Sequence, residues 1–221
     1  MNRIRRCCRG CRIAVGLASV GAVLAGFPMQ ALCADLTVQV HDAKGAPVED
    51  AVVFAEPLAG ATSQKTAHTA EIAQLKRTFI PLVTVVRVGT EISFPNNDPF
   101  KHHVYSFSPA KTFDLPLYSG KSAPPQLFDK VGTVVLGCNI HDKMIAYVQV
   151  VDTPYFGKTD AQGTVRLEGL PNGKYELKTW YYGLPSRKQT LSQPLVMQDA
   201  ESTASFSLDV VRTLPPPLPG H

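Results

Sequence analysis

Short segments rich in β-branched residues follow one another after residue 35, and glycine, proline and aspartate residues separate them. A strand needs roughly four to eight such residues, whereas a helix needs a 3.6-residue apolar period over about ten or more. Only residues 69–76 have a composition suited to a helix, and this segment is short and partly alternating. The pattern therefore predicts an all-β chain of antiparallel β-sandwich type. The expected strands are 36–40, 51–54, 83–88, 91–94, 103–107, 133–137, 144–151, 164–167, 175–181 and 202–210.

Residues 1–34 have the organisation of a Sec-type signal peptide. Five arginines and no acidic residue lie within residues 1–12, an apolar stretch follows over 13–29, and small residues at 31–34 offer a cleavage site. Glycines and a proline interrupt the apolar stretch, which favours a cleaved signal over a permanent membrane span. We therefore expect an exported, for example periplasmic, protein with no stable membrane span in its mature form.

Removal of this segment would change both the charge and the number of cysteines. The chain has 22 basic and 18 acidic residues; subtracting the five arginines of the signal leaves 17 basic residues against 18 acidic ones. A nearly neutral protein without a basic stripe gives no reason to expect a nucleic-acid partner. Cleavage near Cys33 or Ala34 would also remove three or four of the five cysteines and leave Cys138 as the remaining thiol of the folded part.

Cys138 belongs to a short run of potential copper ligands. Within residues 137–144, Cys138, His141 and Met144 place a thiolate, an imidazole and a thioether on one loop, which is a soft ligand set. A type 1 copper site is trigonal, with one thiolate, two imidazoles and a weak axial thioether, so a second histidine must come from elsewhere. The other histidines beyond the signal segment are His41, His68, His102, His103 and His221.

Residues 70–152 resemble the cupredoxins, the blue copper proteins, and in particular their plastocyanin and amicyanin branch. Residues 88–98 and the Lys-His-His-Val run at 101–104 resemble the strand, turn and first-ligand segment of that family. Residues 129–138 resemble the strand that delivers its cysteine. The resemblance implies a Greek-key β-sandwich that transfers electrons to and from a redox protein partner. It implies one copper per chain, held by His102, Cys138, His141 and Met144. Similar proteins are often labelled methylamine utilization proteins, which we treat as a family label.

Two positions depart from this resemblance. The relatives usually carry asparagine after the first ligand, where it hydrogen-bonds across to the ligand loop, but His103 stands here and is an alternative first ligand. The close relatives carry proline where this chain has Ile140, so Ile140 restores an amide donor two residues after the thiolate. Asn139 and Ile140 are therefore candidates for the immediate surroundings of the metal ligands.

A second resemblance covers both flanks of the chain. Residues 158–177 resemble the carboxypeptidase regulatory-like, transthyretin-like β-domain, and residues 38–53 resemble its first hairpin. Together they imply a smaller Ig/transthyretin-like β-sandwich into which the cupredoxin unit is inserted. The alternative is that the opening hairpin extends the cupredoxin sheet. The expected order is signal peptide 1–34, opening hairpin and linker 35–69, cupredoxin unit 70–152, closing part of the flanking unit 153–211, and proline-rich tail 212–221.

The motifs of several enzyme classes are missing from the sequence, among them those for covalent haem, serine hydrolysis, zinc proteolysis and phosphate binding. We therefore expect no enzyme activity, and outer-sphere electron transfer by copper as the function. One alternative is a periplasmic copper carrier or chaperone. Another is a metal-free, ligand-binding β-sandwich in which Cys138 is an inert buried thiol and Met144 an ordinary core residue.

Overall fold

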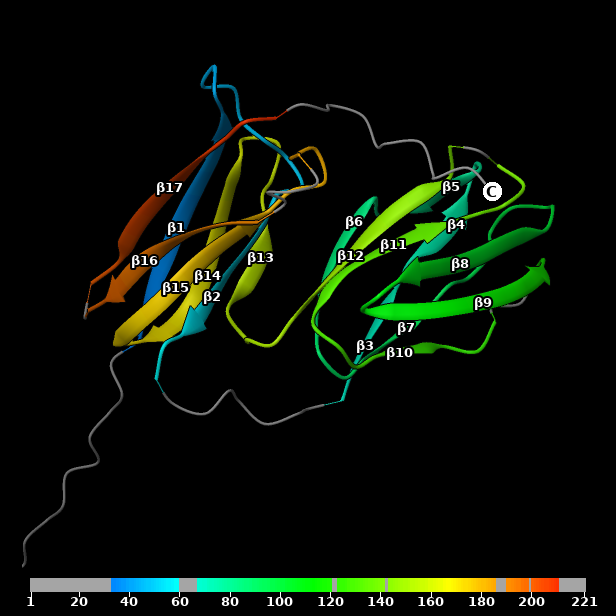
Figure 1. Ribbon diagram of the computed structural model, residues 1–221, viewed down its shortest axis with the longest axis horizontal. Helices are drawn as coiled ribbons and strands as arrows, with labels where there is room; N and C mark the ends of the chain where they lie inside the picture. Colours follow the sequence, from blue (N-terminus) through cyan, green and yellow to red (C-terminus); the bar gives the residue numbers. More distant parts are fainter. Residues whose placement is uncertain are drawn as a thin grey trace, which may run out of the picture. The chain divides into compact units, whose positions relative to one another are not determined.

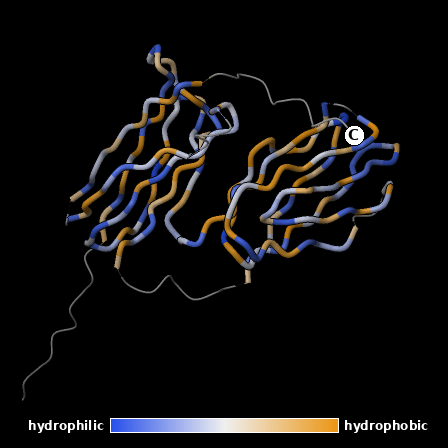
Figure 2. The backbone as a smooth tube through the Cα atoms, in the orientation of Figure 1, coloured by the Kyte–Doolittle hydropathy of each residue, from blue (hydrophilic) through white to orange (hydrophobic). Residues whose placement is uncertain are grey.

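The structure, a computed structural model, describes residues 33–59, 67–120, 123–141, 143–185, 190–198 and 200–210. Every regular element within these ranges is a β-strand, which confirms the all-β fold class. Figure 2 shows hydrophobic and hydrophilic residues alternating along many of these strands. The proposed signal segment up to residue 32 and the proline-rich tail lie outside the described residues. None of the described residues belongs to a helix that is long and apolar enough to cross a membrane.

Two sheets, which we call the flank sheets, are built from the two flanks of the chain (Figure 1). β1 pairs with β14 in antiparallel and with β17 in parallel orientation, while β2 pairs with β13 and β15. Among the described residues, neither β1 nor β2 pairs with a strand of the central segment, so the opening hairpin does not extend the central sheet. The strands, in sheet order, are β14 (Thr164–Pro171), β1 (Cys33–Asp42) and β17 (Ser202–Leu208), then β13 (Phe156–Lys158), β2 (Val52–Pro57), β15 (Gly173–Trp180) and β16 (Thr190–Met197).

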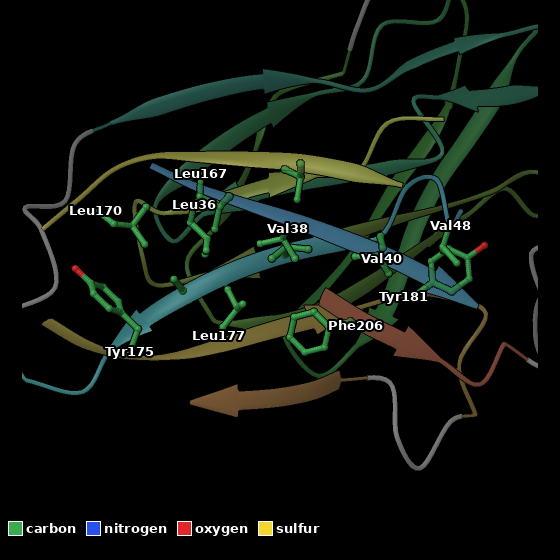
Figure 3. Packing of buried hydrophobic residues seen from close by; sticks show 14 of the residues in the cluster. Leu36, Val38, Val40, Val48, Leu167, Leu170, Tyr175, Leu177, Tyr181 and Phe206 are labelled. Carbon is green, nitrogen blue, oxygen red and sulfur yellow. The ribbon is translucent and has the colours of Figure 1, made fainter. Parts of the chain in front are cut away.

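The flank sheets share one hydrophobic core. In β1, the side chains of Leu36, Val38 and Val40 are fully buried, and more polar residues alternate with them, as expected for a strand with one buried face. Figure 3 shows these side chains close to those of Leu177 and Phe206, which come from β15 and β17. Each such burial stabilises the fold by about 1.5–3 kcal/mol relative to an exposed side chain. Segments from opposite ends of the chain therefore close a single core.

The central segment forms the sheets that position the candidate site, and we call them the central sheets. Their shared core includes Ile92, Phe94, Val104, Phe128 and Leu136, all fully buried, which places the sheets face to face. The five-stranded sheet runs β6 (Val83–Arg87), β12 (Ile145–Val151), β11 (Gly132–Gly137), β8 (His102–Ser108) and β9 (Lys111–Tyr118). The other central sheets are a three-stranded sheet in the order β10 (Gln126–Phe128), β7 (Thr90–Ser93) and β3 (His68–Glu71), and a hairpin of β4 (Ala73–Leu75) and β5 (Thr78–Ile80).

Some elements differ from the expectation. The segment 69–76, whose composition suits a helix best, contributes to β3 and β4 instead. Strands β9 and β16 were not expected, because each contains a proline and several polar residues. Both lie at the edge of a sheet, where a missing amide donor and a solvated face are tolerated. Strand β1 begins at Cys33, so it includes the last two residues of the predicted signal segment, and Cys33 and Ala34 pair with Pro171 and Leu170.

Candidate metal centre

The pairing of three neighbouring strands brings the candidate ligands together. In the antiparallel pair of β8 and β11, Tyr105 pairs with Gly137, the last residue of β11. The start of β8 therefore lies beside the end of β11, and His102 at that start comes close to Cys138. Strand β12 pairs with β11 on the other side, so residues 138–144 connect the two strands of a hairpin. Side chains that are 36 residues apart in the sequence meet in this way.

His102, Cys138 and His141 form a group whose potential ligand atoms all lie within 4.8 Å of one another. Cys138 Sγ is 3.9 Å from His102 Nδ1 and 3.7 Å from His141 Nδ1. The two imidazole rings are 5.0 Å apart between centroids. His102 and Cys138 are buried, whereas His141 is partly exposed. One thiol and two imidazole nitrogens thus face a common point at one end of the central sheets.

Met144, the fourth predicted ligand, lies in the same loop. Its side chain is 1% exposed and belongs to the same hydrophobic cluster as Cys138. Its backbone amide donates a hydrogen bond of 3.0 Å to the carbonyl of His141, which closes the loop into a turn. The strand β12 begins at the next residue, Ile145, so Met144 is a loop residue and not the first residue of the strand. The role of its sulfur as an axial ligand stays a prediction.

His103, the alternative first ligand, has a different environment from His102. Its Nε2 atom lies 2.5 Å from a carboxylate oxygen of Asp114, and its ring packs 5.3 Å from that of Tyr105. Successive residues of a strand face opposite sides, so His102 and His103 cannot both point at Cys138. The structure therefore groups His102 with Cys138 and His141, and not His103.

The two loop residues between Cys138 and His141 are exposed. Asn139 lies on the surface, and the side chain of Ile140 is 48% exposed. Ile140 is not among the residues of the buried cluster that contains Cys138 and Met144. A hydrogen bond from the Ile140 amide to the thiolate stays a prediction.

The sequence analysis missed two residues of the site, Asp98 and Phe100. Asp98 Oδ2 lies 2.7 Å from His102 Nε2, on the side of the ring away from Cys138. The ring of Phe100 lies 5.1 Å from that of His102 and 5.9 Å from that of His141, so it packs against both candidate ligands. The only signal was the turn sequence at 96–99 just before His102, and that signal does not reveal that the turn folds back onto the ring.

Burial and charge set the ionisation of the groups around the site. Burial raises the pKa of Tyr118 to about 12, against the effect of a hydrogen bond from Gln74, and the charge of Cys138 adds to the rise. Burial and the same charge raise the pKa of Tyr105. Burial also acts to raise the pKa of Asp98, but hydrogen bonds from the Arg77 amide, His102 and the Lys76 amide hold it below its usual value. At neutral pH the two tyrosines are therefore neutral, and Asp98 is a carboxylate.

The donor set fits copper. With a metal–sulfur bond of about 2.3 Å and a metal–nitrogen bond of about 2.0 Å, a trigonal arrangement separates sulfur from nitrogen by about 3.7 Å. The two separations here are 3.7 and 3.9 Å. A thiolate with two imidazoles and a nearby thioether is the soft set that copper prefers. His102, Cys138 and His141 could therefore hold a copper ion without a rearrangement of the strands.

No family model matches the sequence, and no curated protein matches it. The chain aligns in part with solved structures, each over less than half of its length. A purple cupredoxin from Nitrosopumilus maritimus is 22% identical, and the alignment covers 37% of this chain and 99% of that chain with a TM-score of 0.34. The reduced Cu(I) form of an amicyanin mutant is 20% identical, with 45% and 98% covered and a TM-score of 0.34. A Cu-containing nitrite reductase from Thermus scotoductus SA-01 is 25% identical, with 43% and 25% covered and a TM-score of 0.36.

Proposed function

We propose that this chain is an exported type 1 copper protein that carries single electrons between redox proteins. The observation that carries the proposal is the group of His102, Cys138 and His141, whose potential ligand atoms lie within 4.8 Å of one another. A trigonal set of two imidazoles and one thiolate, with a weak thioether nearby, is typical of electron-transfer copper sites. Copper, when bound, would supply a one-electron couple between Cu(II) and Cu(I).

The proposed ligands have two different roles: two of them keep the site rigid, and one provides the contact with the partner. Cys138 and His102 are held by the paired strands β11 and β8 and by the core, so their positions change little when the charge of the site changes. His141 is partly exposed and would be the place where an electron enters from a reduced partner or leaves to an oxidised one. The partner supplies or accepts the electron, and the chain performs no substrate chemistry of its own.

Visible absorption spectroscopy tests the proposal. Protein that begins at Cys33, without residues 1–32, should bind one Cu(II) per chain and develop the intense absorption of a copper–thiolate bond. Cys138→Ala should abolish this band. Cys33→Ala is the matched control, because Cys33 is the other cysteine among the described residues, is exposed, and lies on β1 of the flank sheets. A Cys138→Ala protein that still shows the band would overturn the proposal.

A second measurement separates electron transfer from copper delivery. An electron carrier should keep its copper during prolonged exposure to a chelator and should be reduced and reoxidised reversibly. A carrier or chaperone should release the ion to the chelator. Protein that binds no copper at all would favour the metal-free, ligand-binding alternative.

A further inference from the structure

Asp98 is a buried carboxylate that receives three hydrogen bonds. The Lys76 amide donates to Oδ1 at 2.7 Å, the Arg77 amide donates to Oδ2 at 3.0 Å, and Oδ2 also lies 2.7 Å from His102 Nε2. The residue is only 8% exposed. A buried carboxylate is costly unless hydrogen bonds or opposite charges compensate for its lost hydration, and these three contacts provide that compensation.

The turn that supplies the two amides is itself strained. Lys76 and Arg77 connect β4 to β5, and both have positive φ angles, of 53° and 60°. Such a two-residue turn favours asparagine and glycine, and other residues in this region cost about 1–3 kcal/mol each. Both amides of the turn point at the Asp98 carboxylate. The turn therefore forms a concavity that binds an anionic group. The hydrogen bonds to the carboxylate offset the strain, so turn and carboxylate stabilise each other.

The carboxylate also determines which nitrogen of His102 carries the proton. An ionised carboxylate can only accept hydrogen bonds, so His102 Nε2 must be the donor. The neutral ring then keeps a free lone pair on Nδ1, the atom that lies 3.9 Å from Cys138 Sγ. Each oxygen of the Asp98 carboxylate accepts a hydrogen bond from a backbone amide, which is the arrangement of an ionised carboxylate.

We propose that Asp98 is the positioning residue of the metal centre: it fixes His102 as the Nε2-protonated tautomer and lowers the reduction potential of the site. This inference rests on the copper function proposed above. A carboxylate that accepts the second N–H of a ligating imidazole makes the other nitrogen a stronger electron donor. It also adds a buried negative charge close to the metal, where screening by water is weak. Both effects stabilise Cu(II) relative to Cu(I).

The neighbouring pair of His103 and Asp114 provides a matched control. Its carboxylate lies as close to its histidine as Asp98 does, but the side chain of Asp114 is 63% exposed. His103 is not part of the group around Cys138. Removal of the charge of Asp114 therefore changes a similar histidine–carboxylate pair without touching the candidate ligands.

The first measurement needs no metal, and its decisive part uses the wild-type protein alone. Nitrogen-15 NMR of the metal-free protein should show His102 with a proton on Nε2 and none on Nδ1 near neutral pH, and Asp98→Asn should shift the Nε2 signals of His102. Asp114→Asn should shift those of His103 instead. A wild-type His102 protonated on Nδ1 would overturn the inference, whether or not the variants fold.

The second measurement is voltammetry of the copper-loaded proteins. Asp98→Asn should raise the reduction potential by about 59 mV, which corresponds to a tenfold shift of preference toward Cu(I). Asp114→Asn should leave the potential near that of the wild type. A blue Asp98→Asn protein with an unchanged or lower potential overturns this inference alone. A wild-type protein that stays colourless with Cu(II) overturns the proposed function, and the redox part of this inference with it.

Discussion

At the level of single residues, the site depends on which of two adjacent histidines faces Cys138. His102 is fully buried at the start of β8 with Nδ1 toward the thiol, and His103 lies on the other side of the strand against Asp114. Both histidines are buried, so the alternation of side-chain directions along the strand, and not burial, selects the ligand. The resemblance to the cupredoxins predicted His102 as the ligand and kept His103 as an alternative, because the two residues are adjacent and follow the same turn.

The two histidines should respond differently to truncation. His102→Ala should lose the copper–thiolate band, because the trigonal set then lacks one imidazole. His103→Ala should retain the band, because only the pair with Asp114 is lost. Absorption and electron paramagnetic resonance spectra of both copper-loaded variants check this. Greater damage from His103→Ala would show that the assignment of the first ligand is wrong.

At the level of elements, the flank sheets depend on the close approach of a turn to β1. Gly163 has a φ of +71°, and its carbonyl accepts the Val40 amide at 2.7 Å. A Cβ atom at this position would lie 2.4 Å from the Val40 carbonyl oxygen, which belongs to the backbone and cannot rotate away. Glycine is therefore required here for both conformation and space.

Gly163→Ala should lower the free energy of unfolding by more than about 2 kcal/mol, because the added methyl group forces the turn away from β1. Gly169→Ala is the matched control: it has a similar φ of +67° but open space around the Cβ position. Gly169→Ala should lower the free energy of unfolding by about 1 kcal/mol, because alanine is disfavoured at a positive φ angle. Urea unfolding can be followed by the fluorescence of Trp180, the single tryptophan of the chain. Equal losses in both variants would contradict the steric explanation.

Asp35 connects β1 with β14 near an irregularity in their pairing. Its carboxylate accepts hydrogen bonds from the Gly169 amide at 2.9 Å and from the Arg166 guanidinium at 2.5 Å. The Gly169 amide and then Arg166 hold the pKa of this carboxyl below its usual value. A carboxyl with a lowered pKa stabilises the fold above its unfolded-state pKa, and this stabilisation is lost as the pH falls through the folded-state pKa.

Asp35→Asn should therefore unfold at lower urea concentration than the wild type at neutral pH. The difference between the two midpoints should shrink as the pH falls below about 4, near the unfolded-state pKa of an aspartate. Urea titrations of both proteins from neutral to acidic pH measure this difference. A gap that widens toward acidic pH would contradict the role given to the Asp35 carboxylate.

At the level of the whole molecule, the flank sheets combine strands that precede the central segment in the sequence with strands that follow it. β1 lies between β14 and β17 in its sheet, so the first described strand pairs with two of the last four strands. A third buried cluster, which includes Val83, Tyr147 and Trp180, draws residues from both the flank and the central sheets. Removal of Cys33 and Ala34 with an export signal would take away the pairing of the start of β1 with β14.

Because Cys33 and Ala34 belong to β1, we expect signal cleavage before Cys33 and not after Ala34 as the sequence alone suggests, so that the exported protein keeps both residues. Ala34 is 7% exposed and pairs with Leu170. Cleavage after Ala34 would remove this buried residue and leave Leu170 without its partner in β1. The mass of the intact exported protein reports the cleavage site directly. A mature chain that begins at Asp35 or later would contradict this prediction.

Much of the fold and part of the site follow from local sequence. The period-two pattern predicts most strands, and the spacing of Cys138, His141 and Met144 places all three on one loop. Strands such as β9 and β16 were missed because edge positions tolerate proline and polar residues. Asp98 and Phe100 were missed because their contacts depend on how a turn folds back, and short-range patterns do not specify this.

The sequence by itself determined the all-β class and the ligand loop at 138–144, because alternation and loop spacing act between residues that are close along the chain. Only the tertiary structure decided that His102 faces Cys138 across 36 residues, and that Asp98 joins His102 to the Lys76–Arg77 turn 21 and 22 residues away. Such contacts depend on strand register and pairing order. A shift of one residue would turn His103 toward the site in place of His102, so register is the physical quantity that completes the metal centre.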